Sequence, residues 1–526
     1  MTAPRTELTV WSAVVNAALL GTDRRGLVLP SSDGSLGVAC SALIQSESDP
    51  SAALLRVAAA ASAYRRCGWR PRRSDDPLPE PCPPDAKPVC KPAAAALLRR
   101  IMHGEHESLL GAWLTLARRH QVRAPTDVLR DLLDVGKREP ALRAVVLAAG
   151  GTRATWLAGF NEDWSYAIAG DSVDSVVTTF ETGTGAARVA AFQQLRRLDA
   201  ERARVELEKT WAQESPAERA AFTGALAEGL GSADEPFLER ALDDRRKEVR
   251  QQAASLLARL PTSALVARLI ERATSLLSLG KSGILKRTRI DVAPPPEADA
   301  ALLRDGIDSK PPQGLGERAW WLAQIVGVVP PSTWTSRWSL DPTAILKVAG
   351  GNEWSDALVA GWLTATERHR DASWATAFWE HADAARIDPR WASPAPERVF
   401  TTVVAAEQVD AELRRMVDAE QNALRGDSSA LVALLQWQHE WSDPLARAVA
   451  RRLKQYVGDA KVPLTVEFGL RALIERCAHA VPVSAISAFA DGWPEGSGAW
   501  DSWGPAIDAL ISTLRFRGDL DAAFTT

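Results

Sequence analysis

Four consecutive charged residues, Asp243, Asp244, Arg245 and Arg246, stand between two apolar stretches that have the spacing of helices. Two carboxylates can act as acid and base when they face each other. Neighbouring residues on a helix point apart, so Asp243 and Asp244 are not expected to do so. Acidic residues are favoured where a helix begins, because free backbone N–H groups accept negative charge there. We therefore predict a capping turn, whose four charged side chains are also candidates for contact with a protein partner.

A second motif with chemical meaning is Gly-Lys-Ser at 280–282, which matches the end of a phosphate-binding P-loop. The motif also needs a glycine where Ser275 stands, and it should follow a strand rather than the helix expected here. The sequence contains no G-x-S-x-G elbow, no glycine-rich dinucleotide fingerprint and no catalytic Cys/His context. These observations favour a protein that is not an enzyme and that binds no cofactor.

The histidines His103 and His106 are three residues apart, a spacing that would let both reach one metal ion. The H-E-x-x-H arrangement of zinc proteases is missing, and the nearby Cys82 and Cys90 lie in a proline-rich stretch rather than in a Cys-x-x-Cys knuckle. A solvated helix end is the better interpretation, and we expect no metal.

The elements that must position these residues repeat along the chain. Between about 176 and 260 one pattern returns every 31 residues. The equivalent positions are Arg188, Arg219 and Arg250; Leu195, Leu226 and Leu257; Val176, Leu207 and Leu238; and Phe180, Trp211 and Leu242. Each unit reads as two short antiparallel helices, which bury their apolar faces only by stacking on neighbouring units.

Composition limits the kinds of partner. The 526 residues carry a net charge of −4, which gives no overall attraction for nucleic acid or an anionic membrane. An odd number of cysteines, five, is typical of reduced thiols in the cytosol. No apolar run has the length of a membrane span. We expect a soluble, cytoplasmic protein.

The segments predicted to be helical are interrupted by breaks that suggest a domain organisation. A Pro/Gly-rich linker at 291–316 would separate an N-terminal helical lobe, 1–290, from a C-terminal lobe, 317–526. Just before this linker, alternating apolar and basic residues predict a short β-hairpin near 284–292. The chain has 20 tryptophans, many in the C-terminal lobe, and we interpret them as packing between helices.

The stretch DDRRKEVRQQAASLLARLP (243–261) resembles the HEAT-repeat pattern. The fold class that follows is all-α: a HEAT-like α-solenoid of stacked helix pairs in two lobes, with the repeats of 176–260 in the first lobe. Such a fold favours a non-enzymatic scaffold that presents an extended surface to protein partners. The alternative is a HEAT-like nucleic-acid-binding protein or DNA glycosylase, against which the acidic total argues. A hydrolase with a site between the lobes also remains open.

Several motifs together resemble one uncharacterised bacterial helical-repeat family. They are NAALLGTDRRG (16–26), the segment 234–263, AAGGTRATWLAGFNEDW (148–164) and KPPQGLGERAWWLAQIVGVVPPSTW (310–334). Members of that family are encoded beside a SWIM zinc-finger protein, a MoxR-type AAA ATPase and a von Willebrand A-domain protein. The resemblance implies these as protein partners, in a chaperone-like or metal-insertion assembly, and no catalytic residue. A charged stretch follows the first predicted helix: Asp23, Arg24 and Arg25. It is expected either to cap that helix or to contact a partner.

Overall fold

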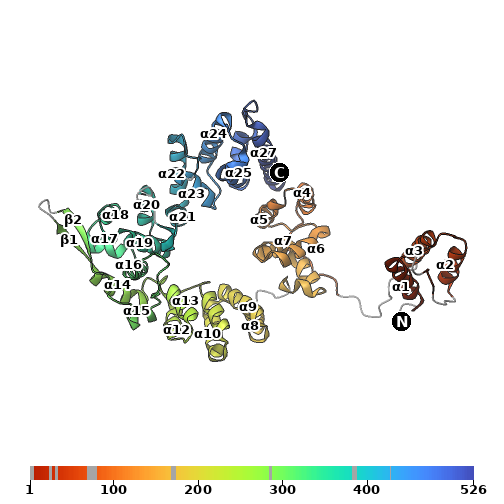
Figure 1. Ribbon diagram of the computed structural model, residues 1–526, viewed down its shortest axis with the longest axis horizontal. Coiled ribbons are helices and arrows are strands. Elements are labelled where there is room, and N and C mark those ends of the chain that lie inside the picture. Colours follow the sequence, from red (N-terminus) through yellow and green to blue (C-terminus); the bar gives the residue numbers. More distant parts are fainter. Residues whose placement is uncertain are drawn as a thin grey trace. The chain divides into compact units, whose positions relative to one another are not determined.

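The structure, a computed structural model, describes residues 5–22, 26–29, 34–67, 80–167, 173–282, 287–381, 388–426 and 428–525. The chain consists of two compact units, Met1–Pro81 and Cys82–Thr526 (Figure 1). The predicted contact residues Asp23, Arg24 and Arg25 lie outside the described residues.

This division differs from the predicted lobes, 1–290 and 317–526, with a linker at 291–316. Part of the predicted linker forms helix α15, Ala300–Arg304. Its Leu302 is buried in an apolar core that contains residues of both predicted lobes. The proline- and glycine-rich segment 291–316 is therefore packed into the solenoid rather than separating two lobes.

The described part of unit 1 contains α1 (Arg5–Leu20), α2 (Ser35–Gln45) and α3 (Pro50–Cys67). Its core is built from Val10, Val14, Leu36, Cys40, Val57 and Ala61. Helix α1 ends before Gly21, whose φ of +84° suits a residue without a side chain.

Unit 2 begins with α4 (Pro92–Met102), α5 (Leu110–Arg119), α6 (Leu129–Arg138) and α7 (Arg143–Ala158). Short 3₁₀ turns lie at Glu107–Leu109 (η1), Thr126–Val128, Pro140–Leu142 and Glu162–Ala167. Trp113 is fully buried in α5, and its indole Nε1 donates to the Ala94 carbonyl of α4 at 2.9 Å. That bond fixes how the first helix pair packs.

The predicted repeats follow. They are formed by α8 (Val173–Thr182), α9 (Gly185–Leu198), α10 (Ala200–Thr210), α11 (Pro216–Ala225), α12 (Glu235–Ala241) and α13 (Lys247–Leu257), with 3₁₀ turns at Trp211–Gln213 and Ser232–Asp234. Helix α11 packs between α9 and α13. The repeated leucines, Leu195, Leu226 and Leu257, are completely buried. The all-α stacked-pair fold is confirmed.

The repeated arginines occupy equivalent places in the three pairs. Arg188 donates through Nε to the carbonyl of Phe180 at 2.9 Å, and Arg219 to that of Glu214 at 3.1 Å. Arg250 donates through Nη1 to the carbonyl of Asp244 at 2.8 Å. Each guanidinium thus satisfies a backbone acceptor at or beyond the end of the preceding helical segment, where carbonyls lack intrahelical partners.

Helix α14 (Ala264–Leu276) leads into an antiparallel hairpin of β1 (Leu277–Ser282) and β2 (Arg287–Val292). The hairpin predicted near 284–292 is confirmed in β2, but its first strand begins earlier than expected. Leu277 and Leu279 alternate and stand opposite Val292 and Ile290. The Gly-Lys-Ser stretch therefore lies in a strand, not in a loop that could wrap a phosphate.

The remaining helices are α16 (Glu317–Val326), α17 (Ser332–Trp338), α18 (Pro342–Ala349), α19 (Ser355–His369), α20 (Ala372–Glu380), α21 (Pro396–Val403), α22 (Ala406–Ala419), α23 (Ser429–Gln436), α24 (Asp443–Asp459), α25 (Phe468–Ala480), α26 (Ile486–Ala490) and α27 (Trp500–Thr525). Further 3₁₀ turns lie at Pro389–Trp391, Leu464–Val466 and Val483–Ala485. Helices α16, α19, α21, α23, α25 and α27 each pack on the next in this order, which continues the stack.

Tryptophans fill the core of α17, α19 and α20. Trp334 and Trp338 have ring centroids 5.0 Å apart, and Trp362 and Trp374 have centroids 5.4 Å apart. The four indole Nε1 atoms are buried and have no hydrogen-bond partner within the described chain. These side chains therefore contribute apolar volume, as the packing interpretation of the tryptophans predicts.

The last helix of unit 2 lies beside its first helices (Figure 1). Phe516, Leu520 and Phe524 of α27 share an apolar cluster with residues of α4 and α5. The Phe524 ring packs edge-on to Trp113, with centroids 5.4 Å apart. The beginning and the end of unit 2 thus complete one core together.

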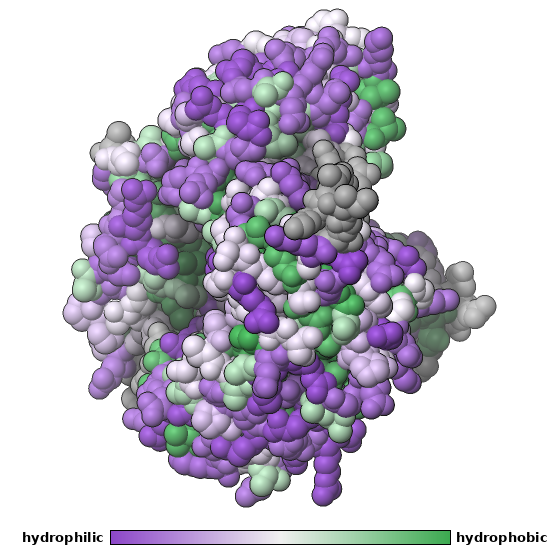
Figure 2. Space-filling model, turned by 90° about the vertical axis from the view of Figure 1, so that its left-hand side faces the viewer, coloured by the Kyte–Doolittle hydropathy of each residue, from purple (hydrophilic) through white to green (hydrophobic). Residues whose placement is uncertain are grey.

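Hydrophilic side chains cover most of the face drawn in Figure 2, with apolar ones scattered among them. None of the described helices combines the length and the hydropathy that a bilayer crossing requires.

Candidate functional site

In the charged turn between α12 and α13, the two acids bind within the protein and the two arginines point to solvent. The Asp243 carboxylate accepts from Arg304 Nε at 2.7 Å and from Nη2 at 2.9 Å, and this hydrogen bonding lowers the pKa of Asp243. Asp244 accepts from the backbone N–H of Arg246 at 2.8 Å, as a capping residue does. Both acids are engaged within the protein. Arg245 and Arg246 are exposed, and no side-chain partner is seen for either in the described chain.

Asp244 also links two repeats. Its Oδ2 accepts from Arg219 Nη1 of the preceding pair at 2.9 Å. One pair earlier, Arg188 donates through Nη1 to Glu214 at 2.8 Å. Hydrogen bonding to Arg188 lowers the pKa of Glu214 and raises that of the arginine. The acids that looked like candidates for contact with a partner therefore join successive units of the solenoid.

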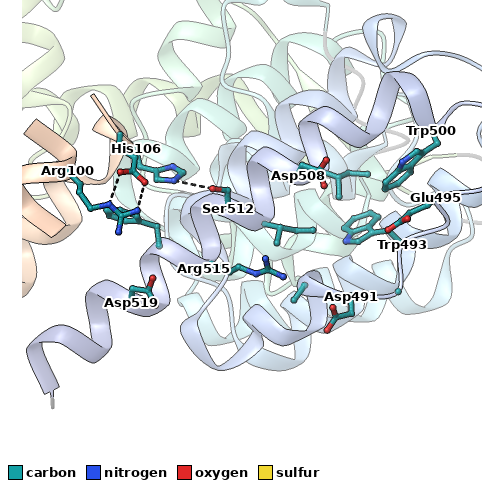
Figure 3. Close-up of a pocket in the computed structure, with 16 residues that line it drawn as sticks. Arg100, His106, Asp491, Trp493, Glu495, Trp500, Asp508, Ser512, Arg515 and Asp519 are labelled. Carbon is teal, nitrogen blue, oxygen red and sulfur yellow. Dashed lines mark hydrogen bonds and ion pairs between the residues drawn. The ribbon is translucent and has the colours of Figure 1, made fainter. Parts of the chain in front are cut away.

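A hollow in the described part of the chain lies where α27 returns to α4 and η1. Its volume is about 530 Å³. We call it the acidic cleft. It is lined by Arg100, Glu105, His106, Ala490, Asp491, Gly492, Trp493, Glu495, Trp500, Ile507, Asp508, Ile511, Ser512, Arg515, Phe516 and Asp519 (Figure 3).

One wall of the cleft is held by an ion pair between Arg100 and Glu105. Arg100 Nε donates to Glu105 Oε2 at 2.7 Å, and Nη2 donates to Oε1. The hydrogen bonds raise the pKa of Arg100 and lower that of Glu105. The Arg100 guanidinium also lies 4.8 Å from the centre of the Phe516 ring, which places α4 against α27.

His106 fixes the same junction from η1. Its φ of +51° is uncommon for a residue with a side chain. The ring lies 4.9 Å from that of Phe516, and one of its nitrogens lies 3.3 Å from Ser512 Oγ (Figure 3). The other nitrogen lies 3.2 Å from Thr513 Oγ1. His106 therefore acts as a wedge between segments that lie 406 residues apart in sequence.

The opposite wall is the loop between α26 and α27. Trp493 donates from Nε1 to the Phe489 carbonyl at 2.8 Å. Lys454 donates to the carbonyls of Ala488, at 2.7 Å, and of Asp491, and its Nζ lies 5.5 Å from the centre of the Trp493 ring. Burial lowers the pKa of Lys454. These bonds hold the Trp493 indole in the wall of the cleft.

Negative charge dominates the interior. Asp491, Glu495, Asp508 and Asp519 are exposed, and within the described chain none of these carboxylates accepts a hydrogen bond or forms an ion pair within 4.0 Å. Arg515 is the one lining cation that is likewise unpaired in the described residues. Two of these carboxylates still act on neighbouring cations, Asp519 on Arg100 and Asp491 on Lys454. Four carboxylates without a hydrogen bond or close ion pair in the described chain, beside two indoles, form a site suited to a cationic group.

The described residues hold no group of three His, Cys, Asp or Glu side chains arranged as a metal would require. His103, considered above as a ligand, instead lies with its Nδ1 2.6 Å from the Arg99 carbonyl. His106 faces hydroxyl groups in the acidic cleft.

Sequence reasoning found only one side of this cleft. The stretch around His106 attracted attention as a metal candidate, whereas the facing segment 490–519 did not. The stretch DGWPEGSGAWDSW (491–503), which ends in the first turn of α27, combines tryptophans and acids with glycines. Trp493 and Trp500 are half-buried there and Trp503 is fully buried. The composition alone does not show which distant segment this stretch will face.

Comparison with known proteins gives a family but no activity. The model of a family described as “Family of unknown function (DUF5691)” matches residues 13–524. No curated protein and no solved structure matches the chain. Because the family model extends over nearly all of the sequence, the chain belongs to this family of unknown function.

Proposed function

We propose that the protein is a non-enzymatic, cytoplasmic scaffold that holds a protein partner through the acidic cleft. The observation that carries this proposal is the set of four unpaired carboxylates, Asp491, Glu495, Asp508 and Asp519, beside two tryptophans in a hollow of about 530 Å³. A lysine- or arginine-rich segment of the partner is the ligand that fits this chemistry.

Each part of the cleft contributes to recognition of a cation. The carboxylates attract a basic segment over several ångströms, and the face of Trp500 offers a cation–π contact of roughly 0.5–2 kcal/mol. The Trp493 ring already lies 5.5 Å from Lys454 Nζ. The stacked helix pairs give the rigid frame on which such a segment can lie. Arg245 and Arg246, exposed on the turn before α13, form a second and smaller candidate contact.

The same charges weigh against nucleic acid at this place. A phosphate backbone is bound through many basic side chains, and the cleft has one unpaired arginine against four unpaired carboxylates among the described residues. A HEAT-like glycosylase activity therefore gains no support from the acidic cleft.

The resemblance noted above gives the partners to test first: the MoxR-type AAA ATPase, the von Willebrand A-domain protein and the SWIM zinc-finger protein encoded beside members of that family. The experiment is to measure the affinity of each purified partner for the full chain and for a double variant, Asp508→Asn with Asp519→Asn. We expect the double variant to bind about tenfold more weakly at low salt, because it removes two charge contacts. Binding of the unmodified chain should also weaken as salt is added.

A matched control is the double variant Asp501→Asn with Asp521→Asn. It removes the same charge from the same helix, but neither residue lines the cleft. Binding to the control should stay within about twofold of the unmodified chain. Equal losses in both double variants, or partners that are recovered only together with nucleic acid, would contradict the proposal.

A further inference from the structure

A second, smaller cavity of about 220 Å³ lies among α13, α16, α19 and the turn at Trp391. Most of its wall is apolar or aromatic, from Ala254, Ala258, Ile307, Trp320, Val328 and Trp391. Ala392, also in the wall, has a φ of +52°, a conformation that side chains disfavour, so the turn is held firmly in place. A cavity of this size fits a small organic molecule rather than a drug-sized one.

Two charged side chains, Arg368 and the ion-paired Asp305, also line this cavity. Arg368, in the last turn of α19, lines the cavity, and its Nη1 donates to the Gly327 carbonyl at the end of α16. No carboxylate of the described residues lies within 4.0 Å of this guanidinium. Burial, with a smaller contribution from the positive charge of Arg259, lowers the pKa of Arg368 to about 10.

The acids nearest to Arg368 serve other arginines. Glu367 forms an ion pair with Arg398 at 2.9 Å. Asp305, which lines the cavity, accepts from Arg268 at 2.6 and 3.1 Å. Both carboxylates therefore have a closer arginine partner than Arg368, although the charge of Glu367 still raises the pKa of Arg368.

The fully buried Arg196 has more partners than Arg368. Arg196 binds both oxygens of Asp234, at 2.9 and 2.8 Å, and also donates to backbone carbonyls at helix ends. Arg452, which is half-buried, donates through Nε and Nη2 to the Val417 carbonyl. Capping α16 explains one N–H group of Arg368, and it leaves the rest of the guanidinium fork without a partner in the described chain.

We propose that this cavity binds a small organic carboxylate, with the acid group on Arg368 and the apolar body between Trp320 and Trp391. An arginine fork matches the two oxygens of a carboxylate in a bidentate pair. The apolar walls favour an organic acid with an apolar body over inorganic phosphate, which has no apolar part to bury there.

The probe is fluorobenzoate, titrated into the full chain and followed by fluorine NMR. Neutral fluorobenzamide has nearly the same shape and tests the need for charge, and inorganic phosphate is added as a competitor. We expect saturable binding of fluorobenzoate, binding of fluorobenzamide that is about tenfold weaker or less, and no displacement by phosphate. Equal binding of acid and amide, absence of binding, or displacement by phosphate would each overturn the proposal.

Two variants locate the site. Arg368→Met removes the charge and should weaken fluorobenzoate binding about tenfold or more. Ser255→Phe starts from an exposed residue of α13 that lines the cavity, so it should occlude the cavity without touching Arg368. If Arg368→Met unfolds because α16 loses its cap, Ser255→Phe alone decides the question.

The matched control is Arg370→Met. Arg370 also donates to a helix-end carbonyl, that of Thr402 at 2.8 Å, but it does not line the cavity. Fluorobenzoate should bind this variant within about twofold of the unmodified chain. A control that loses binding, or a Ser255→Phe variant that keeps it, would show that the acid binds elsewhere.

Discussion

The guanidinium of Arg219 donates to the carboxylate of Asp244 at 2.9 Å, from the second helix of one pair to the turn of the next. Arg188 and Glu214 repeat this relationship one pair earlier. A bond that recurs in register with the helix pairs ties each unit to its neighbour, and units of a solenoid are stable chiefly through such neighbour contacts.

Asp244→Asn is expected to lower the free energy of unfolding by about 1.5–2 kcal/mol, because it weakens a charge-assisted bond of a nearly buried carboxylate. Urea denaturation followed by circular dichroism measures this change. Asp243→Asn is the matched control: its side chain is 63% exposed, and the expected loss is below about 1 kcal/mol. Similar losses for the two variants would show that the link between repeats has no special role.

Arg196→Met is expected to cost about 3–5 kcal/mol, because it leaves the buried Asp234 carboxylate without its main partner. The same change removes donors from the carbonyls of Leu226 and Gly229. Adding Asp234→Asn to this variant should recover part of the loss, since no buried charge then remains unpaired. The proposal would be contradicted if the double variant lost more free energy of unfolding than the two single variants lose together.

Phe524→Ala is expected to destabilise unit 2 by about 3–5 kcal/mol, because the ring is buried against Trp113. Hydrogen exchange should become faster in α4, α5 and α27 and should change less in α10 to α13. Phe468→Ala, at a side chain that is 77% exposed, should leave both stability and exchange nearly unchanged. Uniform acceleration of exchange along the whole chain would speak against a separate core at this junction.

His369 predicts a pH dependence of stability. Burial lowers its pKa below the usual 6.5, and its Nε2 lies 2.7 Å from the Val328 carbonyl, so Nε2 carries the proton of the neutral ring. Between the lowered pKa and 6.5 the unfolded chain binds more protons than the folded one, so stability is complete above pH 6.5 and falls as the pH drops below it.

The measurement is the free energy of unfolding at several pH values from 7.5 to 5, for the unmodified chain and for His369→Gln. Glutamine keeps an N–H donor for Val328 but does not titrate. The difference between the two pH profiles should appear below pH 6.5 and vanish above it. Parallel profiles over the whole range would remove His369 as the cause.

The sequence was sufficient for what depends on local spacing. The 31-residue period placed Leu195, Leu226 and Leu257 correctly in the core, because side chains repeat faithfully on stacked helices. The start of the hairpin was missed, since Leu277 continues an apolar run that helix and strand share. The acidic cleft could not be foreseen, because His106 and Ser512 meet only through the folding of everything between them.

The packing of α27 on α4 and α5 also has a consequence during synthesis. The chain grows at about 5–20 residues per second, and 406 residues separate His106 from Ser512, so roughly 20–80 s pass between their appearances at the ribosome. Throughout that interval the apolar faces of α4 and α5 await Phe516 and Phe524 and remain open to water or to a chaperone. The first core of unit 2 to be translated is therefore among the last to be completed.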